Sequence, residues 1–265
     1  MTNQRDSIKS TLYLWPLRTL YVGHIHRLTQ LSQGAHAVIY GLDSDIQVCV
    51  GEQVFSSRSF LIPAGVRYTG DSFGQRIGCC FLDPLGRDFL FHKPLMKNAE
   101  AGIYFNSSRE GSQLVALNDV HQRGVDAATA YQLLLHELFP GVETQVDGFK
   151  EDRRIVRVVE LIRSDPTENI SNDDLGAQVG LSGARLQRLF KQATGIPIRR
   201  YRLWHRLFVT ASMMAMGSTL TDAGLAAGFS DSSHLNHVFK DMLGTKPSTV
   251  LRRSRSIRIL VGSDT

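Results

Sequence analysis

The chain has 265 residues, enough for two domains at about 100–200 residues each, and 42% apolar with 21% charged residues is typical of a globular protein. The polar first ten residues and the lack of any apolar run near ~18 residues argue against a secretory signal and a membrane-spanning helix, so we expect a cytoplasmic protein. The net charge of +5 is uneven, because residues 1–150 hold 13 basic and 14 acidic side chains whereas residues 151–265 hold 17 and 11.

The first 95 residues have the pattern of a β domain. Turn residues separate short apolar or alternating runs, which predict strands at 20–28, 36–42, 46–50, 59–63 and 77–82. Many short strands at this spacing indicate an antiparallel sandwich or barrel. Cys79 and Cys80 should point to opposite faces of their strand, and three cysteines in the whole chain are too few for a disulfide framework or a zinc site.

A helical pattern follows the predicted strands. Apolar residues recur at helical spacing between Val125 and Phe139, and we expect residues 96–149 to form a helical dimerisation and linker segment, with the linker itself at 141–148. Further on, Ile155, Val158, Val159 and Ile162 predict an amphipathic helix that ends at Asp165 and Pro166.

The C-terminal region contains an internal repeat. Residues 175–182 align with 223–230 at an offset of 48, and residues 189–191 align with 238–240 at an offset of 49. In each copy a short helix ends at a glycine suited to a left-handed turn, and a serine, Ser182 or Ser230, is placed to cap a second helix. This is the pattern of a helix-turn-helix, whose second helix can enter the major groove of DNA.

The second helix of each copy carries outward polar side chains of the kinds that bind base edges and phosphates. The candidate DNA-binding residues are Ala184, Arg185, Gln187, Arg188, Lys191, Ser232, Ser233, Asn236, His237 and Lys240. No acidic residue occurs between Asp174 and Asp222, an interval with seven cations, which favours a polyanion as partner. A predicted helix over 198–216, about 28 Å long, would hold the two reading helices near one DNA turn apart.

Residues 150–253 resemble the DNA-binding domain of the AraC/XylS family of transcription regulators. The resemblance rests on the segments 186–191 and 228–235, on the linker-helix Arg206, and on the closing Gly244 and Pro247. Gly176 and Gly224 depart from the family, which usually has alanine there, and helix-interior glycine predicts a softer domain. By this resemblance, residues 1–95 are a cupin-like jelly-roll that binds an effector or dimerises.

Candidate effector-binding residues in the β domain are Tyr21, His36, Arg67 and Tyr68, although ordinary barrel packing explains them equally well. Tyr68 stands where the cupin motif of enzymes has a metal-binding histidine. His24 and His26 share a strand face, but the third imidazole is missing, so we expect no metal, no cofactor and no catalytic residues.

The sequence therefore predicts an α+β multidomain protein: a β jelly-roll, a helical segment, a tandem helix-turn-helix over 150–253 and a basic tail over 254–265. The expected function is sequence-specific transcription regulation, as an effector-responsive activator and not as an enzyme. Expected partners are double-stranded DNA, RNA polymerase, a small-molecule effector and a second copy of the chain, without a membrane. The alternatives are a cupin-type metalloenzyme with a DNA-binding tail and a regulator controlled by a partner protein. The tail is either a phosphate-contacting arm or a disordered end.

Overall fold

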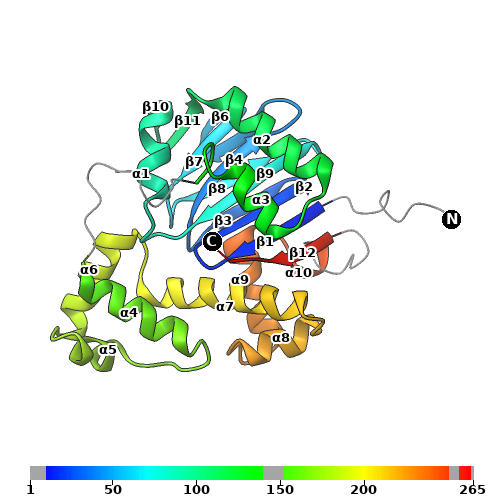
Figure 1. The fold of residues 1–265 in the computed structure, drawn as a ribbon. Helices are drawn as coiled ribbons and strands as arrows, with labels where there is room; N and C mark the ends of the chain where they lie inside the picture. The colour runs from blue at the N-terminus through cyan, green and yellow to red at the C-terminus, as the bar shows by residue number, and fades with distance from the viewer. Residues whose placement is uncertain (1–9, 140–151, 251–256, 264–265) are drawn as a thin grey trace.

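The computed structural model describes residues 10–139, 152–250 and 257–263. The predicted linker at 141–148 and the first residues of the basic tail, 254–256, lie outside this part of the chain. A β-rich domain stacks on a row of helices built from the C-terminal half, with helix α7 running beneath the sheets (Figure 1). The predicted α+β class, a β domain followed by a helical domain, is confirmed.

Two sheets form the β domain. The strands are β1 (Ser10–Trp15), β2 (Arg18–His24), β3 (Leu28–Ser32), β4 (His36–Gly41), β5 (Ile46–Val50), β6 (Gln53–Ser57), β7 (Ser59–Ile62), β8 (Arg67–Asp71), β9 (Arg76–Leu82), β10 (Met96–Glu100), β11 (Ile103–Ser107) and β12 (Ile257–Val261). The larger sheet has the order β10-β11-β7-β4-β9-β2-β1-β12, and the smaller one has the order β3-β8-β5-β6.

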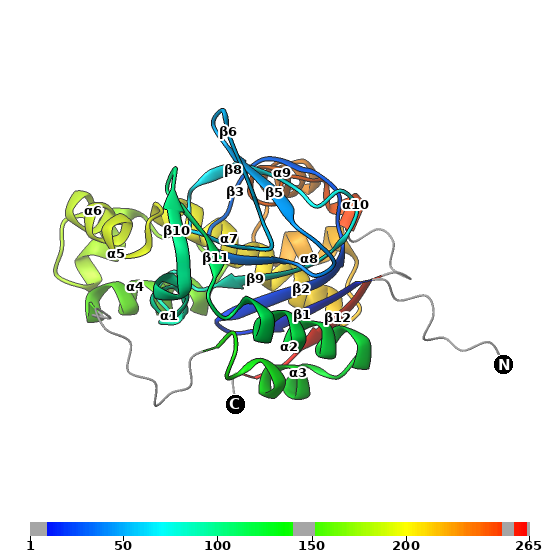
Figure 2. The same ribbon diagram turned by 90° about the horizontal axis from the view of Figure 1, so that it is seen from above.

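The larger sheet is covered on both faces, and the alternation of its side chains shows why. On β4 and β9, Ile39 and Cys79 pack toward the smaller sheet, whereas Val38 and Cys80 pack toward helices α2 (Glu110–Arg123) and α3 (Ala127–Leu134). Figure 2 shows these two helices on one side of the larger sheet and the smaller sheet on the other. The prediction that the adjacent residues Cys79 and Cys80 point to opposite faces of their strand is confirmed.

The segment 96–149 differs from the expectation of a helical segment. It begins with β10 and β11, because β11 pairs with β7 and extends the larger sheet. The chain reaches these strands through α1 (Asp88–His92) and the 3-10 turn η2 (Lys93–Leu95). The helix expected between Val125 and Phe139 is shorter, and its apolar side chains face the sheet: the Trp15 indole donates to the Ala127 carbonyl at 3.1 Å.

The C-terminal half is helical. Its helices are α4 (Arg153–Ser164), α5 (Asn172–Gln178), α6 (Gly183–Thr194), α7 (Ile198–Ala215), α8 (Leu220–Ala226), α9 (Ser232–Leu243) and α10 (Pro247–Val250). The predicted stripe Ile155, Val158, Val159 and Ile162 is buried in the core of the first three helices, as expected. A second core, around Phe229 and α9, lies at the other end of α7.

The end of the chain is not simply a basic tail. Residues 257–261 form β12, which pairs in parallel with β1 at the edge of the larger sheet. Ile259 packs on the core around α9, and Leu260 packs on the core beneath α2 and α3. Arg258, expected to contact phosphate or be disordered, donates instead to the carbonyls of Gly124 and Val125. The chain thus returns to the β domain after the helical domain.

Candidate nucleic-acid interface and ligand cavity

Helices α5 and α6 form the first helix-turn-helix. Gly180 has φ +69° in the turn, a conformation that side chains with a Cβ rarely adopt. Ser182 then caps α6 by accepting a hydrogen bond from the Arg185 backbone N–H at 3.4 Å. Leu186 and Phe190 are buried against α4 and fix the orientation of α6.

The outward face of α6 is free for a partner. Ala184, Arg185, Gln187, Arg188 and Lys191 are all exposed. None of the three cations forms an ion pair with another residue of the described chain. The arrangement gives DNA a positively charged helix face with one amide that can bind a base edge. Direct contact with DNA stays a prediction for each of these side chains.

Helices α8 and α9 form the second helix-turn-helix, with one correction to the sequence prediction. The cap of α9 is Asp231, whose carboxylate accepts from the His234 backbone N–H at 2.8 Å, and not Ser230. Ser182 and Asp231 are separated by 49 residues, so the cap is where the offset of the repeat changes from 48 to 49. The two second helices are equivalent from the cap onward.

The outward face of α9 is polar and has one lysine. Ser232, Ser233, Asn236, His237 and Lys240 are exposed, whereas Leu235 and Phe239 are buried in the core of this unit. Amide and hydroxyl groups can bind base edges without much charge. The first helix therefore carries most of the free positive charge, and the second carries mainly hydrogen-bonding groups.

Helix α7 connects the two units, with α4 to α6 at its start and α8 to α9 at its end (Figure 1). Its 18 residues span about 27 Å, close to the predicted length. Arg206 is buried and donates to the Pro166 carbonyl at 2.7 Å and to the Asn169 side chain at 2.9 Å, which ties α7 to the loop before α5. This arginine is a structural residue of the domain.

The block of seven cations is only partly available to a partner. Arg206, Arg202 and Arg200 donate to groups inside the protein, including the Ile170 carbonyl for Arg202. The exposed members are Arg185, Arg188, Lys191 and Arg199. The sequence count therefore overstates the charge that faces solvent.

The β domain and the helical domain are in direct contact. Asp241 of α9 forms ion pairs with Arg200 of α7 at 2.9 Å and with Arg67 of β8 at 3.1 Å. Arg200 also donates to the Ser32 carbonyl, and the Thr29 backbone N–H donates to the Gly244 carbonyl at 3.3 Å. The end of the second reading helix is thus held by the β domain.

A cavity of about 160 Å³ lies at this contact. Its walls come from both sheets and from α7, α8 and α9, and they are mainly apolar; Trp204, Leu207 and Phe239 are examples from the helical side. Two predicted effector residues, Tyr21 and Tyr68, line it. Gln33 also lines it and is not predicted from the sequence, because the run 32–34 has the composition of a turn.

The other two predicted effector residues lie elsewhere, and this corrects the prediction. His36 packs on Phe89 and accepts from the Ala64 backbone N–H at 3.0 Å, outside the cavity. Burial lowers the pKa of His36 to about 4, so the ring is neutral at pH 7. Arg67 does not line the cavity either, because it points to Asp241 at the domain contact.

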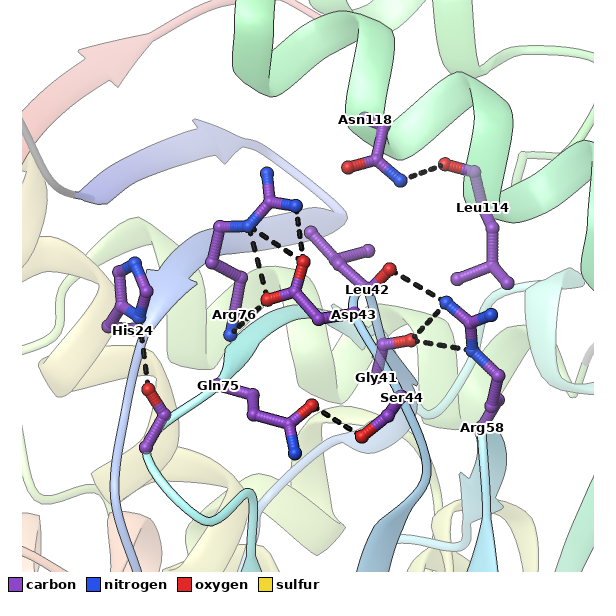
Figure 3. Close-up of polar contacts among 11 residues, drawn as sticks. His24, Gly41, Leu42, Asp43, Ser44, Arg58, Gln75, Arg76, Leu114 and Asn118 are labelled. Atoms are coloured by element: carbon purple, nitrogen blue, oxygen red, sulfur yellow. Dashed lines mark hydrogen bonds and ion pairs between the residues drawn. The ribbon is translucent and has the colours of Figure 1, made fainter.

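The prediction that His24 and His26 share a strand face is wrong, because β2 ends at His24 and His26 lies in the connection before β3. His24 donates from Nδ1 to the Gly74 carbonyl at 3.0 Å, next to the paired side chains of Asp43 and Arg76 (Figure 3). Arg76 hydrogen-bonds to Asp43 and lowers the pKa of that carboxyl. Within residues 10–139, 152–250 and 257–263, no group of three or more His, Cys, Asp or Glu side chains is arranged to hold a metal ion. No helix in the same ranges is long and apolar enough to cross a membrane.

Comparison with known proteins agrees with this geometry. A family model described as a helix-turn-helix domain matches residues 175–253. The HTH-type transcriptional regulator RipA of Corynebacterium glutamicum is 29% identical over 97 residues, which cover 37% of this chain and 29% of RipA. The HTH-type transcriptional regulator ArgR of Pseudomonas aeruginosa is 24% identical over 140 residues, 51% of this chain and 43% of ArgR. The alignments thus span less than half of these relatives.

The structure of an apo point variant of ToxT from Vibrio cholerae is similar over 91% of this chain and 98% of ToxT, with a TM-score of 0.62 and 14% identity. Unsaturated fatty acid bound wild-type ToxT is similar over 89% of this chain and 95% of ToxT, with a TM-score of 0.52 and 13% identity. At this identity the likeness shows a shared fold. The C-terminal domain of the chain is therefore a helix-turn-helix domain with two such units, and the whole chain has the two-domain fold of ToxT.

Proposed function

We propose that the protein is a sequence-specific DNA-binding transcription regulator whose DNA binding responds to a small molecule in the interdomain cavity. The observation that carries the DNA-binding part is the pair of exposed polar helix faces, on α6 and α9, at the two ends of one continuous helix. Adjacent major grooves on one side of B-DNA are about 34 Å apart. Helix α7, about 27 Å long, together with the loops at its ends, suits one chain contacting two successive grooves.

The cavity supports the response to a ligand. Helices α7, α8 and α9 supply one wall and the sheets supply the other, so a molecule bound there contacts both domains. A ligand that binds better in one arrangement of the two domains shifts the protein toward that arrangement. Asp241 lies on α9, the second reading helix, and forms ion pairs with Arg67 and Arg200. A change in the arrangement of the two domains would therefore alter the contacts that hold α9.

Activation of transcription, contact with RNA polymerase and pairing of two copies are further parts of the proposal. For pairing, the expected surface is the outer side of α2 and α3, because their inner faces already cover the larger sheet. Val115 on α2 is 70% exposed and offers an apolar group on that outer side. Sedimentation of the full chain with Val115→Lys tests this: loss of a dimer supports pairing through α2, and an unchanged dimer places the interface elsewhere.

Selection of bound sequences from random DNA tests the DNA-binding part with the full chain. We expect a common sequence with two conserved segments about 10 base pairs apart, one for each reading helix. Binding that increases with positive charge alone, without a selected sequence, would contradict sequence-specific recognition. A selected site whose affinity changes only when another protein is added would favour control by a partner protein.

A further inference from the structure

The interdomain cavity has one polar feature that its apolar walls do not explain. Gln33 lies between β3 and β4, is 2% exposed and lines the cavity. Its Nε2 donates to the Tyr68 hydroxyl at 2.5 Å, and its Oε1 is buried without a hydrogen-bond partner among the described residues. A buried acceptor without a hydrogen bond costs free energy. A ligand that donates a hydrogen bond to Gln33 Oε1 would remove this cost.

Three other hydroxyl groups along the wall already have acceptors. The Tyr21 hydroxyl donates to the His24 carbonyl at 2.8 Å, and the Thr210 hydroxyl donates to the Arg206 carbonyl at 2.8 Å. The Ser72 hydroxyl donates to the Ile25 carbonyl. Among the described residues that line the cavity, the buried side-chain polar atom without a hydrogen-bond partner is Gln33 Oε1, so we expect a polar group of a ligand to bind at Gln33 and Tyr68.

A hydroxyl is the group that this pair accommodates best. With the amide in this orientation, the Tyr68 hydroxyl accepts one Nε2 hydrogen and keeps its own proton, so the pair offers the Tyr68 O–H and the second Nε2 hydrogen as donors and Oε1 as an acceptor. If the amide turns by 180°, Tyr68 donates to Oε1 and Nε2 is left without an acceptor. A hydroxyl both donates and accepts, so it satisfies the pair in either orientation.

The charge of the lining residues and the volume of the cavity restrict the class of ligand further. Of the described residues that line the cavity, none is lysine, arginine or histidine, and Asp71 is the charged one. An anion in this cavity would be buried without a counter-charge from the described lining residues, which is unfavourable. The volume of about 160 Å³ is near that of an apolar cavity of about 150 Å³ that binds benzene.

We propose that the cavity binds an uncharged, ring-sized apolar molecule that carries a hydroxyl group, with the hydroxyl held by Gln33 and Tyr68. The inference rests on the ligand-responsive part of the proposed function and specifies its ligand class. This ligand class differs from the fatty acid bound to ToxT, because no described residue of the lining supplies a cation to pair with the carboxylate of a fatty acid.

Calorimetric titration of the full chain with phenol, toluene and benzoate tests the proposal. Phenol should bind; toluene, which lacks the hydroxyl, should bind about tenfold more weakly or less; benzoate should be weaker still. In Gln33→Leu, the preference for phenol over toluene should shrink, because the ligand hydroxyl loses the amide and keeps only the Tyr68 hydroxyl as a partner. Gln132→Leu, at an exposed glutamine on α3, should keep the preference.

Benzoate binding as tightly as phenol, a phenol preference that is undiminished in Gln33→Leu, or no binding of any of the three probes would each overturn the ligand class. The DNA assay separates this from the proposed function. If phenol binds as expected but affinity for the selected DNA is the same with and without saturating phenol, the ligand class stands and the response to the ligand is overturned.

Discussion

At the scale of single residues, Arg188 is the clearest candidate for a DNA contact. It is exposed on α6 beside Gln187 and has no ion-pair partner in the described chain. If it meets a guanine edge or a phosphate, Arg188→Ala should lose about 1–3 kcal/mol of binding to the selected DNA. Gel-shift titration measures the loss. Arg123→Ala removes the same charge from α2, where Arg123 pairs with Asp119, and equal losses in the two variants would contradict a specific role for Arg188.

The two glycines that depart from the family make a matched pair. A Cβ on Gly176 would come within 2.5 Å of the Leu181 carbonyl oxygen, which belongs to the backbone of the turn. A Cβ on Gly224 would meet the end of the Leu235 side chain at 2.7 Å, which can move. The absence of a side chain at position 176 therefore permits close packing, rather than only softening α5 as the sequence suggests.

We expect Gly176→Ala to lower the free energy of unfolding by about 1–3 kcal/mol. In Gly224→Ala the gain in helix propensity, about 1 kcal/mol, offsets most of the free-energy cost of moving the Leu235 side chain. Urea unfolding of the two variants measures both values. Equal effects at the two positions would show that the close backbone contact at Gly176 does not control its packing.

His36 gives a pH dependence with a definite sign. Burial lowers its pKa to about 4, against about 6.5 in the unfolded chain. Between these two pKa values the unfolded state binds more protons than the folded state. The contribution of His36 to the free energy of unfolding is therefore complete above pH ~6.5 and is lost as the pH falls toward 4. His92, also buried with a pKa of about 4, acts in the same direction.

Each such histidine can add a slope of up to about 1.4 kcal/mol per pH unit to the free energy of unfolding in this window. His36→Gln keeps an acceptor for the Ala64 N–H but cannot titrate. Chemical unfolding between pH 4 and 7 should therefore show a shallower slope in the variant than in the unchanged protein. Parallel slopes would mean that His36 does not stay neutral in the folded state.

At the scale of elements, β12 joins the end of the chain to the β domain and to both cores. Leu260 is half-buried against the core under α2 and α3, whereas its neighbour Val261 is 54% exposed. Leu260→Ala should cost about 1–3 kcal/mol of unfolding free energy, and Val261→Ala should stay within about 0.5 kcal/mol. Thermal or urea unfolding compares them, and a negligible cost at Leu260 would contradict the docking of this strand.

Local patterns predict the elements whose evidence lies within one segment. The strands β4, β5, β7 and β9 follow from alternation and turn residues, and both helix-turn-helix units follow from the repeat. The strand predicted over 20–28 is wrong at its end, because β2 ends at His24 and β3 begins at Leu28. The strand Ser10–Trp15 is not predicted, because five of its six residues are buried and the alternation is lost. Strand β12 depends on a partner at the opposite end of the chain, so no local pattern predicts it.

In the whole molecule, one part of the candidate site can be predicted from local sequence patterns and the other part cannot. The outward residues of α6 and α9 can be predicted because helical periodicity alone separates them from the core. The cavity cannot, because its walls join strands near the start of the chain to helices more than 150 residues further on. Tyr21 and Tyr68 are selected by residue type, as are His36 and Arg67, and residue type cannot say which of them face α7.

We propose that one chain uses two reading helices, held apart by α7, on two successive major grooves. Footprinting on the selected DNA with insertions between the two contacted segments tests it most directly. Five inserted base pairs turn one segment to the opposite side of the duplex, and ten restore the side but exceed the reach of α7 and its loops. We therefore predict that both insertions abolish simultaneous protection of the two segments. Full protection with the ten-base-pair insertion would show that two chains each use one helix-turn-helix and would contradict binding of both grooves by one chain.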